Sequence, residues 1–304
     1  MSSSTWSFFD LHQFQAVLIA GPTASGKSAR AIALAREWNG AVINADSMQV
    51  YQDIPILSAC PSPKERDEAP HLLFGHIGAE RNYSVGQWLD GARSALEEAR
   101  RQGRLPVFVG GTGLYFKALV QGLSAIPAVS ADVRARIRAE YAGVAPEQMH
   151  ARLSEIDPQT AAKLRPTDPQ RLLRALEIFA ATGAPLSAFQ GAREKPLLDA
   201  KSCQCLFIAP EKAELARRID ARFDQMMRAG ALEEVRRLLA RDLDPTLPAM
   251  RAVGVPGLIA HIHGETSLDE AIERGKRDSR RYAKRQFTFA RTQLPEFTWV
   301  APDF

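Results

Sequence analysis

Short apolar runs alternate with helical patterns along the first part of the chain. Runs typical of buried strands cover 16–20, 41–45 and 106–109. Between them, apolar residues recur at helical spacing, most clearly over 85–101. Strands that alternate with helices are typical of a parallel sheet. The pattern therefore predicts an α/β fold, and two later runs, 205–209 and 297–300, are expected to extend the same sheet.

The middle of the chain has a different pattern. No run within 122–190 predicts a strand, and its helical stretches are broken by Pro and Gly. These stretches cover 133–141, 146–156 and 169–182, with Asp132, Thr160 and Asp168 at expected N-cap positions. We therefore predict an all-helical insertion at 122–190 in an α/β core formed by 14–121 and 191–304. Further helices are expected at 212–228, 232–240 and 267–291, and a mobile loop at 61–70.

Composition excludes several classes of protein. The chain has 304 residues, with 45% hydrophobic and 24% charged residues, as in ordinary globular proteins. No apolar run approaches the roughly 20 residues that span a bilayer, and the first residues lack the features of a secretory signal. Three cysteines are too few for a disulfide framework. We expect a cytoplasmic protein that acts as a monomer and does not bind membranes.

Positive charge is concentrated near the end of the chain. The formal net charge is +4, yet the segment from Arg274 to Arg291 holds eight basic residues, opposed within it by Asp278 alone. A solvated helix face and a surface that binds a polyanion both fit this pattern.

A phosphate-binding motif follows the first predicted strand. Its sequence fits G-x-x-x-x-G-K-[ST], in which backbone N–H groups surround a diphosphate, the Lys adds an ammonium group and the final hydroxyl faces a metal ion such as Mg²⁺. The strand before it and the helix after it make an accidental glycine turn the weaker interpretation. The motif does not reveal whether the phosphate belongs to a nucleotide. It comprises Gly21, Pro22, Thr23, Ala24, Ser25, Gly26, Lys27 and Ser28.

Two more polar segments follow the next strands. Asp46 and Ser47 come directly after the second strand, and Thr112 lies among three glycines after the third. Ligands of open α/β sheets bind at the carboxyl ends of the strands, so these residues should meet the phosphate-binding loop. Asp46 could hold Mg²⁺ or accept a proton; the alternative is an ordinary turn aspartate.

The insertion carries basic residues at helical spacing. The helix that begins after Asp168 reads Pro-Gln-Arg-Leu-Leu-Arg, and its Arg171 and Arg174 share one face. Together with Arg134 and the basic C-terminal helix, they indicate a track for a phosphate backbone.

These motifs together resemble a known family. Gly-Pro-Thr-Ala-Ser-Gly-Lys-Ser at 21–28, Asp-Ser-x-Gln-x-Tyr at 46–51, Val-Gly-Gly-Thr-Gly-Leu-Tyr at 109–115 and the 168–174 segment are similar to the bacterial tRNA dimethylallyltransferases, or tRNA isopentenylpyrophosphate transferases. So are Arg-Ala-Val-Gly at 251–254 and Ala-Lys-Arg-Gln-x-Thr at 283–288. The resemblance departs at Val255 and Pro256, where the family commonly has Tyr-Arg, and at Phe289 in place of Trp. A C-terminal zinc finger like that of the eukaryotic relatives is not expected.

The resemblance implies a fold, a reaction and site residues. It implies a P-loop NTPase-like core that transfers a dimethylallyl group from dimethylallyl diphosphate to N6 of an adenosine next to the tRNA anticodon. Asp46 is implied as the base, and Lys27, the loop, Thr112 and Mg²⁺ on Ser28 would stabilise the leaving diphosphate. Arg222 or Arg218 would add a diphosphate contact. The implied tRNA contacts are Asp46, Ser47, Met48, Gln49, Thr112, Arg134, Gln170, Arg171, Leu172, Leu173, Arg174, Arg251 and Gly254.

Other functions fit parts of the same sequence. A P-loop kinase with ATP on the loop and a small substrate would use the first 120 residues, but would not need the helical insertion. An isopentenyltransferase that acts on free adenine nucleotide would share the loop, Asp46 and Thr112. A non-catalytic RNA-binding module is disfavoured by the intact set of Lys27, Ser28, Asp46 and Thr112.

Overall fold

The computed structural model describes residues 13–191 and 193–302, and it divides into two compact units. The first, here called the core, consists of Met1–Val120 and Pro196–Phe304. The second, the insertion, consists of Gln121–Lys195, where the sequence predicts 122–190.

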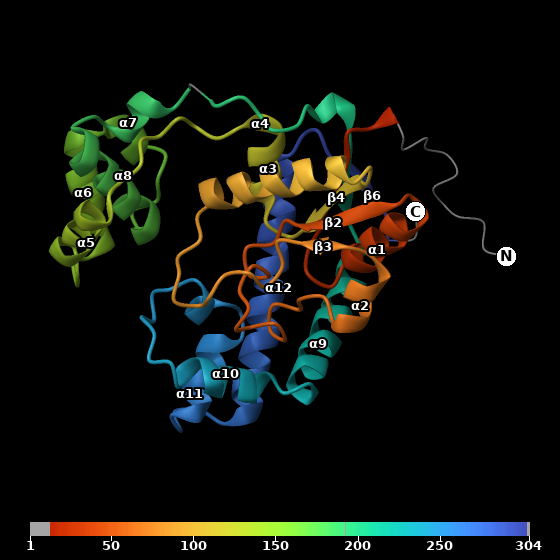
Figure 1. Cartoon of the computed structure of the whole chain (residues 1–304). Helices are drawn as coiled ribbons and strands as arrows, with labels where there is room; N and C mark the ends of the chain where they lie inside the picture. The colour runs from red at the N-terminus through yellow and green to blue at the C-terminus, as the bar shows by residue number, and fades with distance from the viewer. Residues whose placement is uncertain (1–12, 192, 303–304) are drawn as a thin grey trace. The chain divides into compact units, whose positions relative to one another are not determined.

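One parallel sheet of six strands forms the centre of the core (Figure 1). Its strand order is β3-β2-β4-β1-β5-β6, and every pairing in it is parallel. Buried residues such as Val17, Val42, Val107 and Leu206 form the apolar centre of the sheet. The predicted α/β class is therefore confirmed. The strands are β1 Ala16–Ala20, β2 Gly40–Asn44, β3 His71–Leu72, β4 Leu105–Gly110, β5 Cys203–Ile208 and β6 Thr298–Val300.

The strand order places the phosphate-binding loop at a crevice of the sheet. The chain leaves β1 toward β2 on one side, and after β4 it goes to β5 on the other side. Neighbouring strands whose connections diverge in this way leave a gap at their carboxyl ends, where ligands of α/β proteins bind. Right-handed crossovers put α1 and α3 on opposite faces of the sheet. The loops after β1 and β4 therefore flank one crevice.

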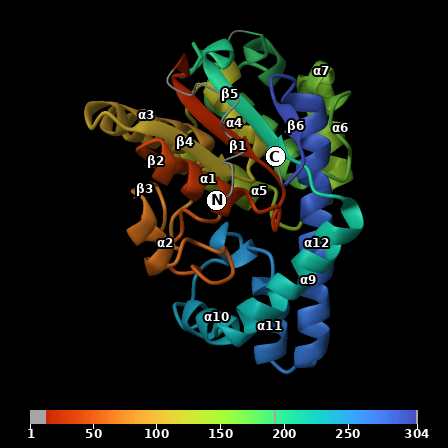
Figure 2. The same cartoon turned by 90° about the vertical axis from the view of Figure 1, so that its right-hand side faces the viewer.

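Helices cover the sheet and extend beyond it. The longest, α12, lies beside α9, and α10 and α11 lie at its far end (Figures 1 and 2). Phe223 of α9 fits against Gly275 of α12, where a Cβ atom would come within 2.1 Å of the ring. The helices of the core are α1 Lys27–Glu37, α2 Pro63–Glu68, α3 Val85–Arg101, α4 Gly113–Gln121, α9 Lys212–Arg228, α10 Ala231–Leu239, α11 Val255–Ile262 and α12 Leu268–Gln293.

The prediction of a mobile loop at 61–70 is wrong, because this segment contains α2. Ser62 Oγ accepts a hydrogen bond from the backbone of Glu65, and the Glu65 carboxylate accepts one from the backbone of Ser62. This capping box, together with Pro63 at the first helical position, starts a helix despite the density of prolines. Periodicity did not predict the short β3 strand, α2, α4, α11 or the one-turn helix α7 (Pro158–Ala161). None of them is longer than nine residues, so the pattern of each is weak.

The insertion has its own small apolar core. Ile137, Met149, Leu153, Leu172 and Leu176 are buried against one another. Its described residues, 121–191 and 193–195, form no strand, only an isolated bridge between Ser124 and Arg193. Its helices are α5 Ala131–Glu140, α6 Pro146–Ile156, α7 Pro158–Ala161 and α8 Pro169–Thr182.

One of the three predicted caps of the insertion is confirmed. Asp168 caps α8 by accepting from the Arg171 backbone. The other two predictions are wrong: Ser130, not Asp132, caps α5, and Asp157, not Thr160, caps α7. In each case the residue that caps the helix lies two or three positions before the predicted one. Both residues are of types that cap helices, so a local sequence pattern does not distinguish between them.

Candidate active site

The phosphate-binding loop adopts a tight turn that leads directly into α1. Gly26 precedes the helix with a φ of 89°, and Ala24 has a φ of 61°, which is uncommon for a residue other than glycine. Left-handed residues in such a loop turn successive N–H groups toward one concave side, where an anion binds. The loop also holds a buried hydroxyl, Ser25 Oγ, that has no hydrogen-bond partner among the described residues. These features fit a diphosphate seated on the loop.

Asp46 is held by the end of strand β2. Asn44, which is fully buried, accepts a hydrogen bond from the Asp46 backbone (2.8 Å) and donates one to the Asp46 carbonyl (3.0 Å). Trp88 of α3 donates to the Asn44 carbonyl (2.9 Å) and so fixes the strand end. Asp46 Oδ1 accepts from the Met48 backbone (3.0 Å). One carboxylate oxygen is thus occupied, and Oδ2 is the one that faces the end of β4.

Two glycines let strand β4 approach Asp46. A Cβ atom on Gly110 would lie 2.0 Å from the Ala45 carbonyl oxygen. A Cβ on Gly111 would lie 2.1 Å from Gln286 Nε2 and 3.1 Å from Asp46 Oδ2. No other residue fits these distances. The glycines that the sequence places around Thr112 therefore serve close backbone approach.

Thr112 joins the two strand ends. Its hydroxyl accepts from the Ser47 backbone (2.9 Å) and donates to Ser47 Oγ (3.2 Å). The side chain of Tyr282 of α12 lies near Thr112. The Thr112 and Ser47 hydroxyls thus lie beside Asp46, as the sequence predicts, and are hydrogen-bonded to each other.

Gln286 of α12 is a site residue that sequence analysis did not single out. Its side chain accepts from the Thr23 backbone (3.0 Å) and donates to the Gly111 carbonyl (2.8 Å). It therefore joins the phosphate-binding loop to the end of β4. Tyr282 precedes it by one helical turn, so both side chains lie on one face of α12. The sequence signal was the 283–288 motif, which contains Gln286 and directly follows Tyr282.

We expect Gln286→Ala to weaken both the fold and the loop. The change leaves the buried Gly111 carbonyl and the partly buried Thr23 N–H without partners, which costs about 2 kcal/mol in free energy of unfolding. Because Thr23 belongs to the phosphate-binding loop, the affinity of the loop for inorganic diphosphate should fall as well. Denaturant unfolding and titration with inorganic diphosphate measure the two effects. Gln52→Ala, which removes an exposed side chain, is the control and should change neither.

A cavity of about 80 Å³ opens beside these residues. Its polar lining residues are Thr23, Asp46, Ser58, Arg222, Ser279 and Tyr282. The rest of the wall is mainly apolar, so the cavity suits a ligand with one charged end and a small hydrocarbon end. The apolar lining residues are Met48, Leu57, Ile219, Phe223, Met226 and Val253.

Positive charge gathers at the polar end of this cavity. Burial lowers the pKa of Lys27 to about 8; the Asp46 charge raises that pKa and the Arg222 charge lowers it further. Burial also lowers the pKa of Arg222, against the effects of Glu65 and Asp46. Arg218 instead donates to Glu214 (2.7 Å) at the surface. Of the two arginines considered from sequence, Arg222 is therefore the one at the site.

The oxygen donors of the site fit one kind of metal. Among the described residues, no group of three or more His, Cys, Asp or Glu side chains could hold a metal ion. Mg²⁺ needs few protein ligands when it binds together with substrate phosphates. A hydroxyl on Ser28 and a carboxylate on Asp46 suit that mode of binding and do not suit a zinc site.

A buried carboxylate positions the loop that carries Leu57. Glu234 of α10 is 1% exposed and accepts from the backbones of Ile56 (2.7 Å) and Leu57 (2.9 Å). Gln49, 9% exposed, donates to the carbonyls of Ser58 and Ala59 in the same loop. Both side chains therefore hold in place the loop whose residues Leu57 and Ser58 line the cavity. A tRNA contact was predicted for Gln49. Its amide nitrogen instead donates both of its hydrogen bonds within the protein, so this group is not free to contact tRNA.

Glu234→Ala should destabilise the protein by about 3 kcal/mol. The change removes two charge-assisted hydrogen bonds and leaves two N–H groups unsatisfied. The free energy of unfolding measures the loss. Its neighbour Glu233 is exposed and forms only a surface ion pair with Arg236, so Glu233→Ala should cost less than about 1 kcal/mol. Equal losses for the two variants would contradict the anchoring role of Glu234.

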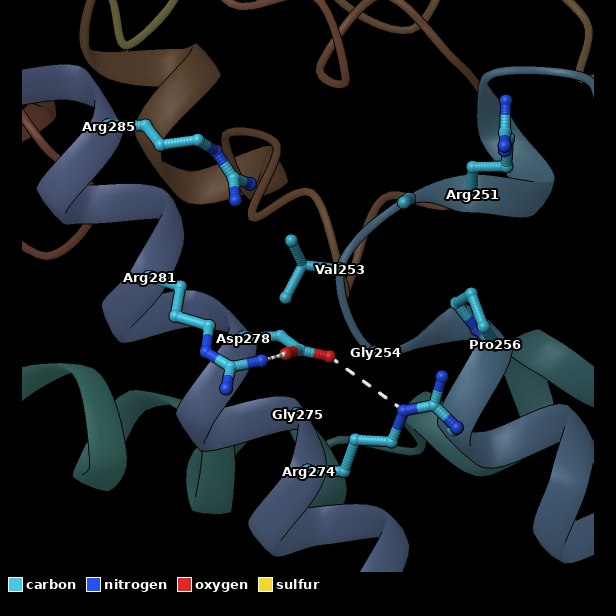
Figure 3. Close-up of a pocket in the computed structure, with 11 residues that line it drawn as sticks. Arg251, Val253, Gly254, Pro256, Arg274, Gly275, Asp278, Arg281 and Arg285 are labelled. Atoms are coloured by element: carbon cyan, nitrogen blue, oxygen red, sulfur yellow. Dashed lines mark ion pairs between the residues drawn. The ribbon is translucent and has the colours of Figure 1, made fainter. Parts of the chain in front are cut away.

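A second cavity, of about 230 Å³, lies between α12 and the segment before α11 (Figure 3). We call it the arginine pocket, because Arg251, Arg274, Arg281 and Arg285 line it together with Asp278. Val253 lines both this pocket and the cavity at Asp46. The segment also holds the departure from the family pattern: Val255 is buried and Pro256 lines the pocket.

The basic run at 274–291 is more neutralised than the sequence indicates. Helix α9 supplies two acids, so that Lys276 pairs with Asp224 (2.8 Å) and Arg280 with Asp220. Acids from outside the segment therefore oppose the run as well, because α9 packs along α12. Arg274, Arg281 and Arg285, which line the pocket, are among the basic residues of the run for which no ion pair with α9 is found in the described part of the chain.

Three arginines of the insertion converge on one buried acid. Glu177 is 3% exposed and pairs with Arg138 (3.3 Å), Arg174 (3.4 Å) and Arg134 (3.9 Å). Three cations around one carboxylate leave excess positive charge on half-exposed side chains. Gln170 and Arg171 are exposed on the same helix, and Arg171 pairs with Asp168 (3.6 Å).

The prediction of a tRNA contact for Leu172 is wrong for its side chain. Leu172 is fully buried in the apolar core of the insertion, and Leu173 is partly buried against the same core. A helix with one buried stripe presents only its other face. The polar side chains that this helix start exposes fully or in part are therefore those of Gln170, Arg171 and Arg174.

A glycine-rich loop between β1 and α1, at the crevice of a parallel sheet, defines a P-loop type of phosphate-binding core. A family model described as "IPP transferase" matches residues 49–293, and one described as "Isopentenyl transferase" matches 14–72. The chain belongs to the IPP transferase family. Among its described residues, no helix is long and apolar enough to cross a membrane.

Individual relatives agree with this assignment. A tRNA dimethylallyltransferase of Methylocella silvestris is 60% identical over 95% of this chain and 96% of its own length. One from Beijerinckia indica is 58% identical over 95% of each. The solved tRNA isopentenylpyrophosphate transferase of Bacillus halodurans is 35% identical, with a TM-score of 0.66 over 94% of this chain and 89% of that chain. A eukaryotic dimethylallyltransferase acting on tRNA is 29% identical, with a TM-score of 0.78 over 94% and 73%.

Proposed function

We propose that this chain transfers a dimethylallyl group from dimethylallyl diphosphate to N6 of an adenosine next to the tRNA anticodon, forming N6-isopentenyladenosine. One observation carries the proposal: Asp46, the phosphate-binding loop and Arg222 meet at a cavity whose other walls are mainly apolar. Family membership and the names of the relatives favour this reaction over a small-molecule kinase.

The cations of the site serve the leaving group. As the bond from the allylic carbon to the diphosphate oxygen breaks, its electron pair leaves with the diphosphate. Lys27, the loop N–H groups and Arg222 stabilise that charge. Ser28 would hold Mg²⁺, which neutralises further charge on the diphosphate when it is bound.

Asp46 serves the attacking group. The exocyclic amine of adenine is a weak nucleophile, because its lone pair is delocalised into the ring. As N6 forms its bond to the allylic carbon, a proton must leave N6, and the Asp46 carboxylate is the group placed to accept it. The hydrogen bond from Met48 to Oδ1 orients the carboxylate and leaves Oδ2 for this role.

The acceptor base must leave the stack of the anticodon loop to reach Asp46. Extrusion of a base costs about a few kcal/mol, which contacts to the RNA must offset. We propose Ser47, Met48, Thr112, Arg251 and Gly254 in the core, and Arg134, Gln170, Arg171 and Arg174 in the insertion, as those contacts. We further propose that the protein acts as a monomer in the cytoplasm.

Label transfer tests the proposal. The purified protein is incubated with Mg²⁺ and radiolabelled dimethylallyl diphosphate, together with either an anticodon stem-loop or AMP. Label in the stem-loop alone is the expected result, with the product identified as N6-isopentenyladenosine after digestion. Label in AMP alone would assign the protein to the free-nucleotide enzymes. Label in neither would contradict both, and ATP turnover would then test the kinase alternative.

A further inference from the structure

The apolar wall of the cavity at Asp46 lies against helix α12 at Phe223. This residue of α9 is 2% exposed, and it lines the cavity. A Cβ atom on Gly275 of α12 would lie 2.1 Å from Cζ of the Phe223 ring and 2.5 Å from its Cε2. The edge of the ring therefore occupies the place that a side chain at position 275 would take. The ring cannot retreat toward α12 when a ligand fills the cavity.

The neighbouring wall residue Leu57 is held in place as well. A Cβ atom on Gly254 would lie 3.1 Å from Leu57 Cδ2 and 3.2 Å from Phe223 Cε2, so the two side chains meet at this glycine. The Leu57 backbone donates a hydrogen bond to the buried carboxylate of Glu234 (2.9 Å). A closely packed wall of this kind selects ligands by size, because it does not adapt to a larger one without strain.

A second space lies on the other side of the Phe223 ring. Gly254 and Gly275, against which the ring packs, both line the arginine pocket of about 230 Å³. Phe223 lines the cavity at Asp46 and not the arginine pocket, whereas Val253 lines both. The ring is therefore part of the partition between these two spaces, and its loss would let the cavity at Asp46 extend.

The size of the cavity at Asp46 suits a short hydrocarbon. Its volume is about 80 Å³, whereas apolar cavities of about 150 Å³ hold a benzene molecule. A dimethylallyl group is close to this limit, and the ten-carbon geranyl group exceeds it. The ring that Phe223→Ala removes is similar in size to the five carbons by which geranyl exceeds dimethylallyl, so an exchange of ring for chain nearly conserves volume.

We propose that Phe223 sets the length of the prenyl donor: its ring admits the five-carbon chain of dimethylallyl diphosphate and excludes allylic diphosphates of ten or more carbons. The proposal rests on the proposed function and names the residue that selects its donor. The reaction is the same with either donor. A bond forms between N6 and the allylic carbon, the bond from that carbon to the diphosphate oxygen breaks, and the proton of N6 goes to Asp46. Selection therefore depends on fit and not on reactivity.

Donor preference tests this role. With the stem-loop saturating, kcat/KM is measured for dimethylallyl and geranyl diphosphate with the wild type, Phe223→Leu and Phe223→Ala. The wild type should prefer dimethylallyl diphosphate by about 100-fold or more. Phe223→Ala should reduce this preference at least about tenfold, and Phe223→Leu should reduce it less. Because both donors are compared within one variant, the ratio does not depend on how much of a destabilised variant is folded.

Gly275→Ala is a change of opposite sign. The added methyl group should push the Phe223 ring toward the cavity. Affinities are measured without RNA for inorganic diphosphate and for unreactive thiolodiphosphates with the five-carbon and ten-carbon chains. Gly275→Ala should weaken binding of the five-carbon compound about tenfold and leave inorganic diphosphate unchanged. In the Phe223→Ala background, the same methyl group should have no such effect, because the ring that it displaces is absent.

Phe297→Ala is the matched control for the loss of a buried ring. Phe297 is 4% exposed, packs against Phe116 and does not line the cavity at Asp46. Its loss should destabilise the protein and leave the donor preference as it is in the wild type. An equal change of preference in Phe297→Ala and Phe223→Ala would overturn the role of Phe223.

The outcomes separate the size limit from the reaction. Transfer of the dimethylallyl group by the wild type, with the same donor ratio in both Phe223 variants, would refute the size limit and leave the proposed function standing. A preference of the wild type for the five-carbon thiolodiphosphate that Phe223→Ala removes, without transfer to the stem-loop, would support the size limit and refute the proposed reaction.

Discussion

Asp46→Asn is expected to lower the rate of prenyl transfer by about 10²- to 10⁴-fold, the usual contribution of a positioned general base. The amide of asparagine has nearly the shape of the carboxylate but does not accept a proton at neutral pH. Its oxygen can still accept the hydrogen bond from the Met48 backbone, and the backbone bonds to Asn44 remain. The fold and the affinity for the stem-loop should therefore stay close to those of the wild type.

Single-turnover rates with saturating stem-loop and dimethylallyl diphosphate measure this effect, together with the dissociation constant of the stem-loop. Asp90→Asn removes an exposed carboxylate on α3 and controls for the lost charge. A rate for Asp46→Asn near that of the wild type would remove Asp46 as the base. A large loss of stem-loop affinity would instead assign it to RNA binding.

Lys27→Ala is expected to raise the KM for dimethylallyl diphosphate by about 10- to 100-fold, the effect of losing a hydrogen-bonded charge partner. Lys27 Nζ donates to the Pro22 carbonyl (3.0 Å) within the loop, and Arg222 supplies a second cation nearby. The affinity for the stem-loop should change little, because the loop faces the diphosphate. Initial rates over a range of donor concentrations measure the KM. An unchanged KM would contradict the assignment of the loop to the diphosphate.

The lowered pKa of Lys27 predicts a pH dependence of donor binding. With a pKa of about 8 in the free protein, Lys27 loses its proton as the pH rises through 8. The diphosphate binds the protonated form better, so the KM of the wild type should rise above pH 8. Lys27→Ala should lack this rise. The same rise in both proteins would assign it to another group.

Deprotonation of Lys27 has the opposite effect on stability: it weakens donor binding but favours the folded free protein. The folded pKa of Lys27 lies below the ordinary value of 10.5, so between pH 8 and 10.5 the unfolded chain binds more protons than the folded chain. The contribution of Lys27 to the free energy of unfolding therefore increases over this window in the free protein. The burial of the ammonium group is thus unfavourable below pH 8, and under the proposed function a bound diphosphate offsets this cost.

The sequence by itself determined the features that arise from neighbouring residues. The strand, turn and helix around residues 21–28 follow from an apolar run, glycines and a helical pattern within 22 residues of one another. The ends of β2 and β4 could be placed beside this loop, because parallel strands bring their carboxyl ends to one edge. Asp46 and Thr112 were predicted at the site for that reason. The cap of α8 at Asp168 is local in the same sense.

Only the tertiary structure decided which distant side chains complete the site. Gln286 bonds to Thr23 across 263 positions of the chain, and no local pattern encodes such a contact. The packing of α9 along α12 paired Arg280 and Lys276 with acids and left Arg285 to the arginine pocket. Periodicity and charge describe what a segment can expose. Which face is exposed, and which charges remain without partners, depends on the elements that pack against it.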